Sequence, residues 1–227
     1  MIGIIGAMDI EVNNIIANIT NLEKWEMGQL SFYSGKIEDI DVCVVKCGIG
    51  KVNAAITASL MISKYQPQII INTGIAGGIN LDPESLFVCD DLLYYDVDVR
   101  AFGYKLGQVP GLPERFLSNK KIKEAILNVL KNKNIPFFEG TIYSGDSFLS
   151  NSTRLNDFDI KKEAAVEMEG AAIAQVCTKL EVDFASIRFI SDRLDTSNHI
   201  ADYQSFETEA AMRSSIILME VIKGLSI

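Results

Sequence analysis

Short apolar segments alternate with longer amphipathic segments along the whole of this 227-residue sequence. Continuous apolar runs are typical of strands buried on both faces, and apolar residues at helical spacing predict helices. A chain in which the two alternate folds as an α/β protein, with a sheet covered by helices. Because no linker, repeat or low-complexity stretch interrupts this order, one domain is expected over residues 1–227. The predicted strands are 2–7, 41–48, 67–74, 137–145, 164–168 and 183–192, and the predicted helices are 51–65, 119–133, 170–180 and 206–223.

The charge of the chain restricts its partners. With 21 basic and 30 acidic residues the formal net charge is -9, so the electrostatic field repels phosphate backbones and anionic lipid. We therefore expect a small-molecule partner and neither nucleic acid nor membrane. The opening segment turns acidic at Asp9 and has its first basic residue at Lys24, which does not fit a signal peptide. No stretch approaches the ~20 apolar residues of a membrane helix, and a cytoplasmic protein is expected.

Cysteine and histidine are too sparse for several common kinds of site. His199 is the one histidine, so a Ser-His-Asp triad or a zinc site would depend on it alone. We expect no metal and no cofactor, and carboxylates are expected to carry any proton chemistry. The cysteines form no C-x-x-C pair and lie among aliphatic residues, which favours reduced core thiols. They are Cys43, Cys47, Cys89 and Cys177.

Acids and glycine-bearing turns follow the predicted strands. In α/β folds ligands bind beyond the carboxyl ends of the strands, and here those ends carry "GIGK", "NTGIAGG", "SGDSFL", "EMEG" and "SD". Taken alone, "GIGK" is an ordinary turn because it lacks the rest of a P-loop, and "NTGIAGG" does not fit the dinucleotide motif. Glu11 and Asp192 are each compatible with a plain structural role, as a first-turn acid and as a cap.

Glu167 and Glu169 are harder to explain structurally. If residues 164–168 form a strand, both side chains point to one face while Met168 points to the other. Two neighbouring carboxylates are unfavourable unless cations or hydroxyls surround them. The pair therefore indicates either a bound polyol or buried hydrogen-bond donors.

The combination of motifs resembles a known family. In order and spacing, "IGIIGAM", "GIGKVNAA", "IINTGIAGG", "DVDVRAFGYKLGQVPG", "SGDSFL", "AVEMEGAAIAQVC" and "RFISD" are similar to 5'-methylthioadenosine/S-adenosylhomocysteine nucleosidases of the nucleoside phosphorylase superfamily. The resemblance covers essentially the whole chain. It implies a single nucleoside phosphorylase-like catalytic domain over residues 1–227, built as a three-layer α/β/α sandwich with a central mixed, twisted sheet.

The same resemblance implies an activity and the residues behind it. The enzyme would release adenine from 5'-methylthioadenosine, S-adenosylhomocysteine and 5'-deoxyadenosine by inverting attack of water, in methionine salvage. Glu11, helped by Arg188, would activate the water, and Asp192 would protonate N7 of adenine, a role for which burial can raise the pKa of an aspartate. Glu169 would hold the ribose hydroxyls. The other implied binding residues are Met8, Glu167 and Met168 near the sugar, Ile75, Ala76 and Gly77 in the "NTGIAGG" loop, Phe148, Leu149 and Ser191 near the base, and Ile49, Phe206 and the partner subunit's Phe102 around the 5'-substituent.

One position departs from the family pattern and bears on the alternatives. Many relatives carry Ser or Thr where this chain has Ile75, and that hydroxyl belongs to the phosphate site of phosphorylases, so water is the expected nucleophile. The alternatives are a related hydrolase or phosphorylase acting on futalosine or inosine, and a non-catalytic nucleoside-binding protein.

A homodimer is expected because residues 100–111 carry three glycines, at 103, 107 and 111, and a proline, yet expose more apolar surface than a solvated loop usually does.

Overall fold

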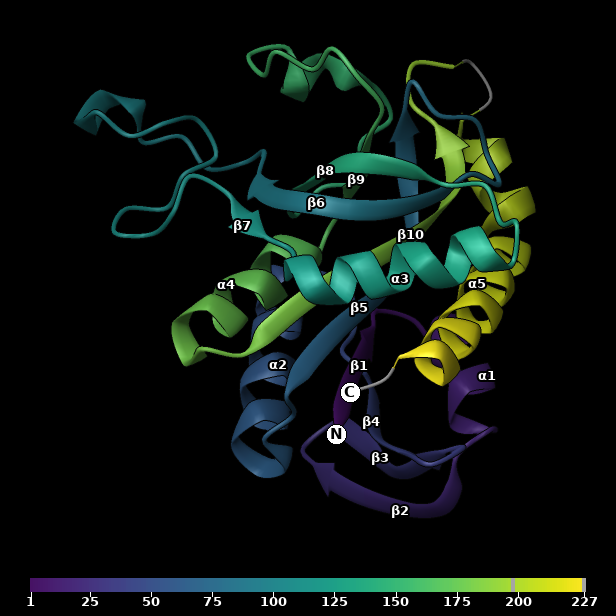
Figure 1. Cartoon of the computed structure of the whole chain (residues 1–227). Helices are drawn as coiled ribbons and strands as arrows, with labels where there is room; N and C mark the ends of the chain where they lie inside the picture. The colour runs from purple at the N-terminus through teal and green to yellow at the C-terminus, as the bar shows by residue number, and fades with distance from the viewer. Residues whose placement is uncertain (197–198, 226–227) are drawn as a thin grey trace.

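The computed structural model describes residues 1–196 and 199–225, with side chains for all of these except residues 199–202 (Figure 1). The side chain of His199, the histidine on which a triad or zinc site would depend, therefore lies outside the described residues. The described chain forms a mixed sheet with helices on both faces, so the predicted three-layer α/β/α architecture is confirmed.

In the described part of the chain, ten strands form the sheet and helices cover both of its faces. The strands are β1 (Ile2–Gly6), β2 (Thr20–Met27), β3 (Leu30–Ile37), β4 (Ile40–Lys46), β5 (Ile69–Ile79), β6 (Leu86–Tyr94), β7 (Phe116–Leu117), β8 (Phe138–Ser144), β9 (Ala164–Glu167) and β10 (Asp183–Arg193). The α-helices are α1 (Asp9–Ile16), α2 (Lys51–Tyr65), α3 (Lys120–Asn132), α4 (Gly170–Leu180) and α5 (His199–Gly224), and the short 3-10 helices are η1 (Arg100–Phe102) and η2 (Ser152–Leu155).

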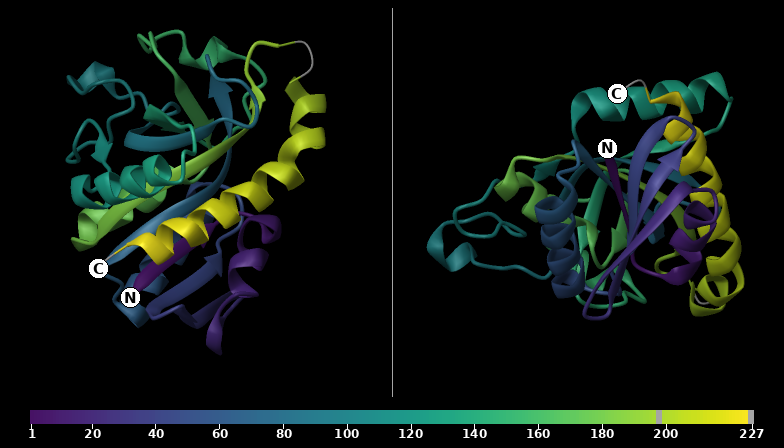
Figure 2. Two further views of the ribbon diagram at one scale, coloured as in Figure 1. Left: turned by 45° about the vertical axis from the view of Figure 1, so that its right-hand side comes forward. Right: turned by 90° about the horizontal axis from the view of Figure 1, so that it is seen from below.

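The two helical layers follow from the side-chain alternation of the buried strands. In β1, Ile2 and Ile4 pack in the apolar cluster that contains Val12 of α1, on the face shared with α3 and α5. Ile5 points to the opposite face, where it packs in the cluster formed with Ala54 of α2 and with α4. Figure 2 shows the result, with α2 on one side of the sheet and α1 and α5 on the other.

Strand β5 changes its neighbour halfway along its length. Residues 69–72 pair with β1 and residues 77–79 pair with β9, while β10 runs along the other edge over residues 69–78. Because β10 also pairs with β6, β6 with β8 and β8 with β9, the strands β5, β10, β6, β8 and β9 close into a ring. The open part of the sheet, from β1 through β4 and β3 to β2, continues from this ring.

Four of the described strands were missed from the sequence: β2, β3, β6 and the two-residue β7. Strand β2 reads "TNLEKWEM" and is mostly exposed, so its polar composition hides it, and β6 carries two aspartates, Asp90 and Asp91, in its middle. Strand β9 ends at Glu167, one residue before the predicted end. Helix α5 begins at His199, well before the predicted start at residue 206. In the described part of the chain, no helix has the length and apolar character to cross a bilayer.

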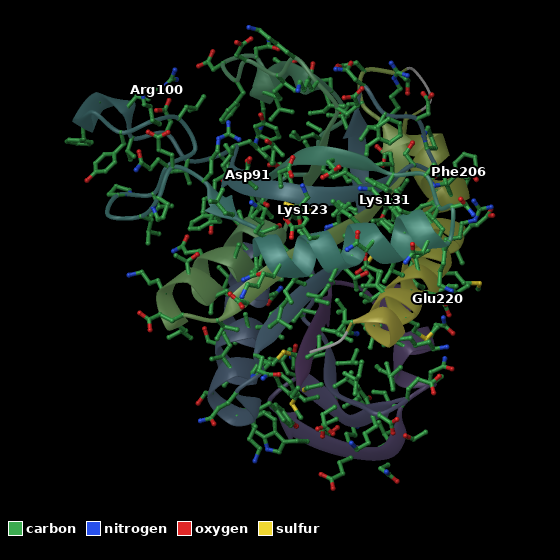
Figure 3. All side chains as sticks on the ribbon, in the orientation of Figure 1. Asp91, Arg100, Lys123, Lys131, Phe206 and Glu220 are labelled. Atoms are coloured by element: carbon green, nitrogen blue, oxygen red, sulfur yellow. The ribbon has the colours of Figure 1, made fainter. Side chains whose placement is uncertain are left out.

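Two further features of the fold are a long connection that leaves its body and the proximity of its first strand and last helix. Residues 95–115, between β6 and β7, leave the body of the molecule as an excursion that carries η1 at its far end (Figure 1), and Figure 3 shows Arg100 there. The start of β1 and the end of α5 lie beside each other in every view (Figures 1 and 2).

Candidate active site

A pocket opens where β5 exchanges β1 for β9 as its neighbour, at the carboxyl ends of β1 and β10, which is where α/β folds bind ligands. Carboxylates, two methionines and two aromatic rings share its walls. The lining residues are Ala7, Met8, Glu11, Ile49, Ile75, Ala76, Gly77, Ser147, Phe148, Leu149, Val166, Glu167, Met168, Glu169, Ser191, Asp192 and Tyr203.

Most residues that the sequence placed at a site come together in this pocket, and three do not. Arg188 is buried beneath the pocket, and Phe102 is 80% exposed on the excursion. Phe206 is half-buried on α5 (Figure 3), but Tyr203, nearly one turn earlier on the same helical face, lines the pocket in its place. Phe206 is therefore absent from the pocket wall of this structure, and its place around the 5'-substituent stays a prediction. The lining residues that the sequence prediction missed are Ala7, Ser147, Val166 and Tyr203.

The carboxylate of Glu11 is held by backbone amides from the turn after β1 and from β5. Its Oε2 accepts from Ala7 N at 2.6 Å and Met8 N at 2.9 Å, and its Oε1 accepts from Ile75 N at 3.0 Å. The Ile75 amide faces Glu11 because β5 pairs with neither β1 nor β9 at that residue. Burial raises the pKa of Glu11, while the charge of Arg188 and the three amides oppose the rise. The result is a fixed, buried carboxylate, the arrangement expected of a general base.

Arg188 and Glu167 form a buried ion pair under the pocket. Arg188 Nη2 lies 2.6 Å from Glu167 Oε2, with side chains 1% and 3% exposed. Arg188 also donates to the side chain of Asn72, and its Nη1 donates to Thr73 O at 3.1 Å. Any side chain at Gly74 would collide with both the Glu11 carboxylate and the Arg188 guanidinium. Glycine at this position therefore lets the base and the cation approach each other.

Glu167 and Glu169 do not share a strand face, because β9 ends at Glu167 and Glu169 is the N-cap of α4. Glu167 Oε2 accepts from the amides of Glu169 and Gly170 at 2.9 and 2.7 Å, and its Oε1 accepts from the hydroxyl of Ser144. Buried donors, one of the two alternatives left open by the sequence, thus surround Glu167. They fix the start of α4, and with it the position of Glu169.

Glu169 is a further buried carboxyl group of the pocket. Its side chain is buried and its Oε1 accepts from Gly50 N at 2.7 Å, at the start of α2. Burial, reinforced by the charge of Glu167, raises the pKa of Glu169 to about 8, although Arg188 and the Gly50 amide oppose the rise. Such a group can exchange protons or hydrogen bonds with a ligand near neutral pH.

A bulge in β10 brings two adjacent polar residues into the pocket. The register with β5 shifts between Ile190 and Asp192, so Ser191 and Asp192 both line the pocket, whereas neighbours in a regular strand face opposite ways. The Ser191 hydroxyl donates to Asp192 Oδ1 at 2.7 Å, and Asp192 is 2% exposed. A second buried carboxyl group is thereby oriented by its own neighbour, on a different wall from Glu11.

Apolar groups form the mouth of the pocket. Phe148 is 53% exposed and Ile49 55% exposed, and the Phe148 ring lies 5.2 Å from the Tyr203 ring at 78°, edge to face. Tyr203 is carried by α5, which is fastened to β5 by the Thr73 and Ser214 hydroxyls at 3.0 Å. Within the described residues, no group of three or more His, Cys, Asp or Glu side chains is arranged to hold a metal ion.

Comparisons with known proteins agree with this geometry. The profile of the phosphorylase superfamily matches residues 1–223. A 5'-methylthioadenosine/S-adenosylhomocysteine nucleosidase of Staphylococcus haemolyticus is 40% identical over 99% of this chain and 100% of its own. The crystal structure of the nucleosidase of that name from Neisseria meningitidis, in complex with methylthio-immucillin-A, superposes with a TM-score of 0.92 at 34% identity, over 99% of both chains.

A second named activity occurs among the solved structures. A futalosine hydrolase mutant of Helicobacter pylori superposes with a TM-score of 0.91 at 29% identity, over 99% of both chains. Its fold is shared with this chain, but its identity is lower than that of the nucleosidases above. On sequence, fold and coverage, this chain belongs to the phosphorylase superfamily and, within it, to the family of 5'-methylthioadenosine/S-adenosylhomocysteine nucleosidases.

Proposed function

We propose that this chain hydrolyses the N-glycosidic bond of 5'-methylthioadenosine, S-adenosylhomocysteine and 5'-deoxyadenosine, releasing adenine and the 5-substituted ribose. The observation that carries the proposal is the presence of two buried, separately anchored carboxyl groups, Glu11 and Asp192, on the walls of one pocket. Cleavage of a glycosidic bond commonly uses one carboxyl group as acid and another as base. Histidine and cofactors are not required by this chemistry.

Each carboxyl group has a distinct role in the proposal. Asp192 donates a proton to N7 of adenine, which makes the base a better leaving group as the sugar becomes an oxocarbenium ion. Glu11 takes a proton from the attacking water, which adds to the opposite face of the sugar and inverts its configuration. Glu169 accepts hydrogen bonds from the ribose hydroxyls, while Phe148 stacks on the purine. Met8 and Met168 pack against the sugar and exclude bulk water.

Water is favoured over phosphate as the nucleophile by the surroundings of Glu11. Ile75 lines the pocket there with an apolar side chain. Arg188, the nearby cation, is already engaged by Glu167, Asn72 and the Thr73 carbonyl. A phosphate ion would therefore meet the Glu11 carboxylate without a cation to compensate.

A substrate panel tests this proposal. Adenine release is measured for 5'-methylthioadenosine, S-adenosylhomocysteine and 5'-deoxyadenosine, with inosine and futalosine as the competing nucleosides, each with and without phosphate. We expect release from the adenine nucleosides at a rate independent of phosphate. A requirement for phosphate would replace the hydrolase by a phosphorylase, and preferential cleavage of futalosine would place the chain with the hydrolases of that nucleoside.

A homodimer is proposed on the apolar surface beside the pocket. Val52 and Ile56 of α2 are 68% and 50% exposed, and they line a groove together with Val97 and Val109 of the excursion. Surfaces of this kind are typical of subunit interfaces. We propose that a second copy of the chain covers the groove and that the partner subunit's Phe102 closes the pocket around the 5'-substituent.

The cellular setting follows from the substrates. We propose that the cleavage of these thionucleosides serves methionine salvage and the detoxification of the methyl cycle. We place the reaction in the cytoplasm. The support for this is that Cys43, Cys47, Cys89 and Cys177 are all buried and unpaired, as is usual in reducing compartments.

A further inference from the structure

Three segments that are far apart in sequence meet at Lys51, the first residue of α2. Lys51 Nζ lies 2.7 Å from Asp96 Oδ2, at the root of the excursion, and 3.8 Å from Asp146 Oδ2. Asp96 Oδ2 also accepts from the backbone amide of Asp146 at 2.9 Å. The side chains of Lys51 and Asp96 are 23% and 20% exposed. The cluster thus ties the "GIGK" turn and the "SGDSF" loop to the end of β6.

Asp146 also contacts the backbone of that turn. Its Oδ1 accepts from Lys51 N at 2.8 Å, and a carboxylate at a helix N-terminus is stabilised by the unpaired amides there. The preceding amide, Gly50 N, donates to Glu169 Oε1 at 2.7 Å. Two consecutive amides of one turn therefore bind Asp146 on one side and the pocket carboxylate Glu169 on the other.

The backbone conformation of the turn favours glycine at position 50, and a glycine has no side chain with which to cap the helix that follows. Gly50 has φ +99, in the region that favours glycine, and a Cβ there would lie 3.1 Å from Asp146 Oδ1. As the N-cap of α2, Gly50 has no side chain that could bind the first amides of the helix. Asp146 supplies that acceptor from a different loop.

We propose that Asp146 is a positioning residue for the ribose site: by holding the Lys51 amide it keeps the Gly50 amide against Glu169, and so fixes the carboxylate that receives the substrate diol. Lys51 and Asp96 orient Asp146 for this task. The proposal rests on the role given to Glu169 under the proposed function. It predicts that Asp146, which is 48% exposed and lies outside the pocket lining, affects affinity through the ribose hydroxyls.

A binding cycle tests the proposal. The probes are 5'-methylthio-7-deazaadenosine, which resists hydrolysis because carbon replaces N7, and its 2',3'-dideoxy counterpart. Their dissociation constants are measured by calorimetry on the full chain for wild type, Asp146→Ala, Asp146→Asn and Glu169→Gln. Asp41→Ala is the matched control, because Asp41 forms an exposed pair with Lys36 at 3.2 Å on β3 and β4. Thermal unfolding of each variant reports folding.

The expected result is specific to the diol. At pH 9, where Glu169 with its pKa of about 8 is mostly ionised, removing the diol should weaken binding to wild type about 10- to 100-fold, the range for hydrogen bonds to a charged group. In Asp146→Ala, removing the diol should raise the dissociation constant by less than about threefold, because Glu169 is no longer held in place. The affinity of this variant for the dideoxy probe should stay within about twofold of wild type. Asp146→Asn keeps an Oδ1 acceptor for Lys51 N and should restore the diol effect. Asp41→Ala should match wild type.

Two other outcomes overturn separate parts of the argument. If Asp146→Ala weakens both probes by the same factor while Glu169→Gln abolishes the diol effect, Asp146 is not a positioning residue for the ribose site. If Glu169→Gln leaves the diol effect intact, the ribose role of Glu169 fails, and the inference about Asp146 fails with it. Adenine release by the wild type is measured in parallel, so that a failure of the proposed nucleosidase activity can be told apart from both of these results.

Discussion

Arg188 and Glu167 lie 2.6 Å apart in an ion pair whose side chains are almost fully enclosed by β5, β10 and the start of α4. The pair connects the two halves of the pocket: Glu167 accepts from the backbone amides of Glu169 and Gly170, and the charge of Arg188 acts on Glu11. Arg188 does not line the pocket. Its ion pair with Glu167 nevertheless influences both the proposed base, Glu11, and the proposed ribose ligand, Glu169.

Breaking this ion pair should destabilise the protein severely. Glu167→Ala leaves the Arg188 guanidinium buried without its carboxylate, which typically costs about 3–5 kcal/mol. The measurement is the free energy of unfolding from a denaturant titration. Glu84→Ala is the control, because Glu84 pairs with Arg213 at 2.6 Å with side chains 43% and 45% exposed, and such pairs contribute about 0–1 kcal/mol. Equal losses for the two variants would contradict the structural role of Glu167.

Glu11→Gln should separate binding from chemistry. The amide retains the shape of the carboxylate but cannot accept a proton from water, so turnover should fall by about 10²- to 10⁴-fold. Binding of a non-hydrolysable nucleoside analogue, measured by calorimetry, should persist, because the proposed adenine and ribose contacts come from other residues. Loss of analogue binding in a folded variant would make Glu11 an affinity residue.

Asp192→Asn should remove the proton donor while keeping a hydrogen-bonding side chain beside Ser191. General acid catalysis is typically worth about 10² to 10⁴ in rate, so steady-state turnover of 5'-methylthioadenosine should fall by that order. A variant that retained more than half of the wild-type turnover would rule out Asp192 as the acid.

The unliganded protein should become less stable as the pH rises, because Glu169 is protonated in the folded state at lower pH and ionises as the pH approaches 8. Its pKa is about 8 in the folded state against 4.5 as the reference, so between these values the folded state keeps a proton that the unfolded state releases. The stabilisation is therefore present below about pH 4.5 and is lost as the pH approaches 8. Thermal unfolding from pH 5 to 8 measures it.

The comparison that isolates this effect uses Glu169→Gln, which cannot titrate. The difference in Tm between wild type and variant should fall by about 5–15 °C over this pH range, because other titrating groups contribute equally to both. A difference that stays constant or grows with pH would mean that Glu169 is already ionised in the folded protein.

Subunit mixing tests the shared pocket. Phe102→Ala chains are combined with Asp192→Asn chains under conditions that allow exchange. If Phe102 acts on the neighbouring pocket, the mixed dimer has one pocket with both substitutions and one with neither, so activity should exceed that of either parent. Absence of such a rise after demonstrated exchange, or full activity of a monomer, would exclude the shared pocket.

The sequence predicted most of the largely buried strands, although it missed β6, whose two aspartates interrupt the apolar run. Strands β1, β4, β5 and β10 are continuous apolar runs, which is why they could be located within one or two residues over most of their bounds. Strand β2 was missed because it lies at the outer end of the sheet and its exposed residues have no apolar pattern. Edge position, which is a property of the whole sheet, decides how a strand's sequence looks.

The pocket residues were predicted from the strand ends and from the family resemblance, and what the sequence did not show is the local geometry that brings them together. The bulge that turns both Ser191 and Asp192 toward the pocket leaves no periodic signal. Glu167 and Glu169 were expected on one strand face because nothing in "AAVEMEG" shows that the strand stops at Glu167. Tyr203 could have been found by extending the helical spacing of α5 backwards from Phe206, since the two residues are three apart.

The start of β1 and the end of α5 lie on the side of the molecule away from the pocket. Met1 precedes the amino end of β1, whereas the pocket lies beyond its carboxyl end, and α5 carries Tyr203 near its start and finishes at Gly224. A support or a fused carrier protein attached at either end would therefore leave the pocket mouth facing solution. Because the start of β1 and the end of α5 are also neighbours, a short peptide joining these two elements would allow the chain to be reopened elsewhere, with the arrangement of its elements in space unchanged.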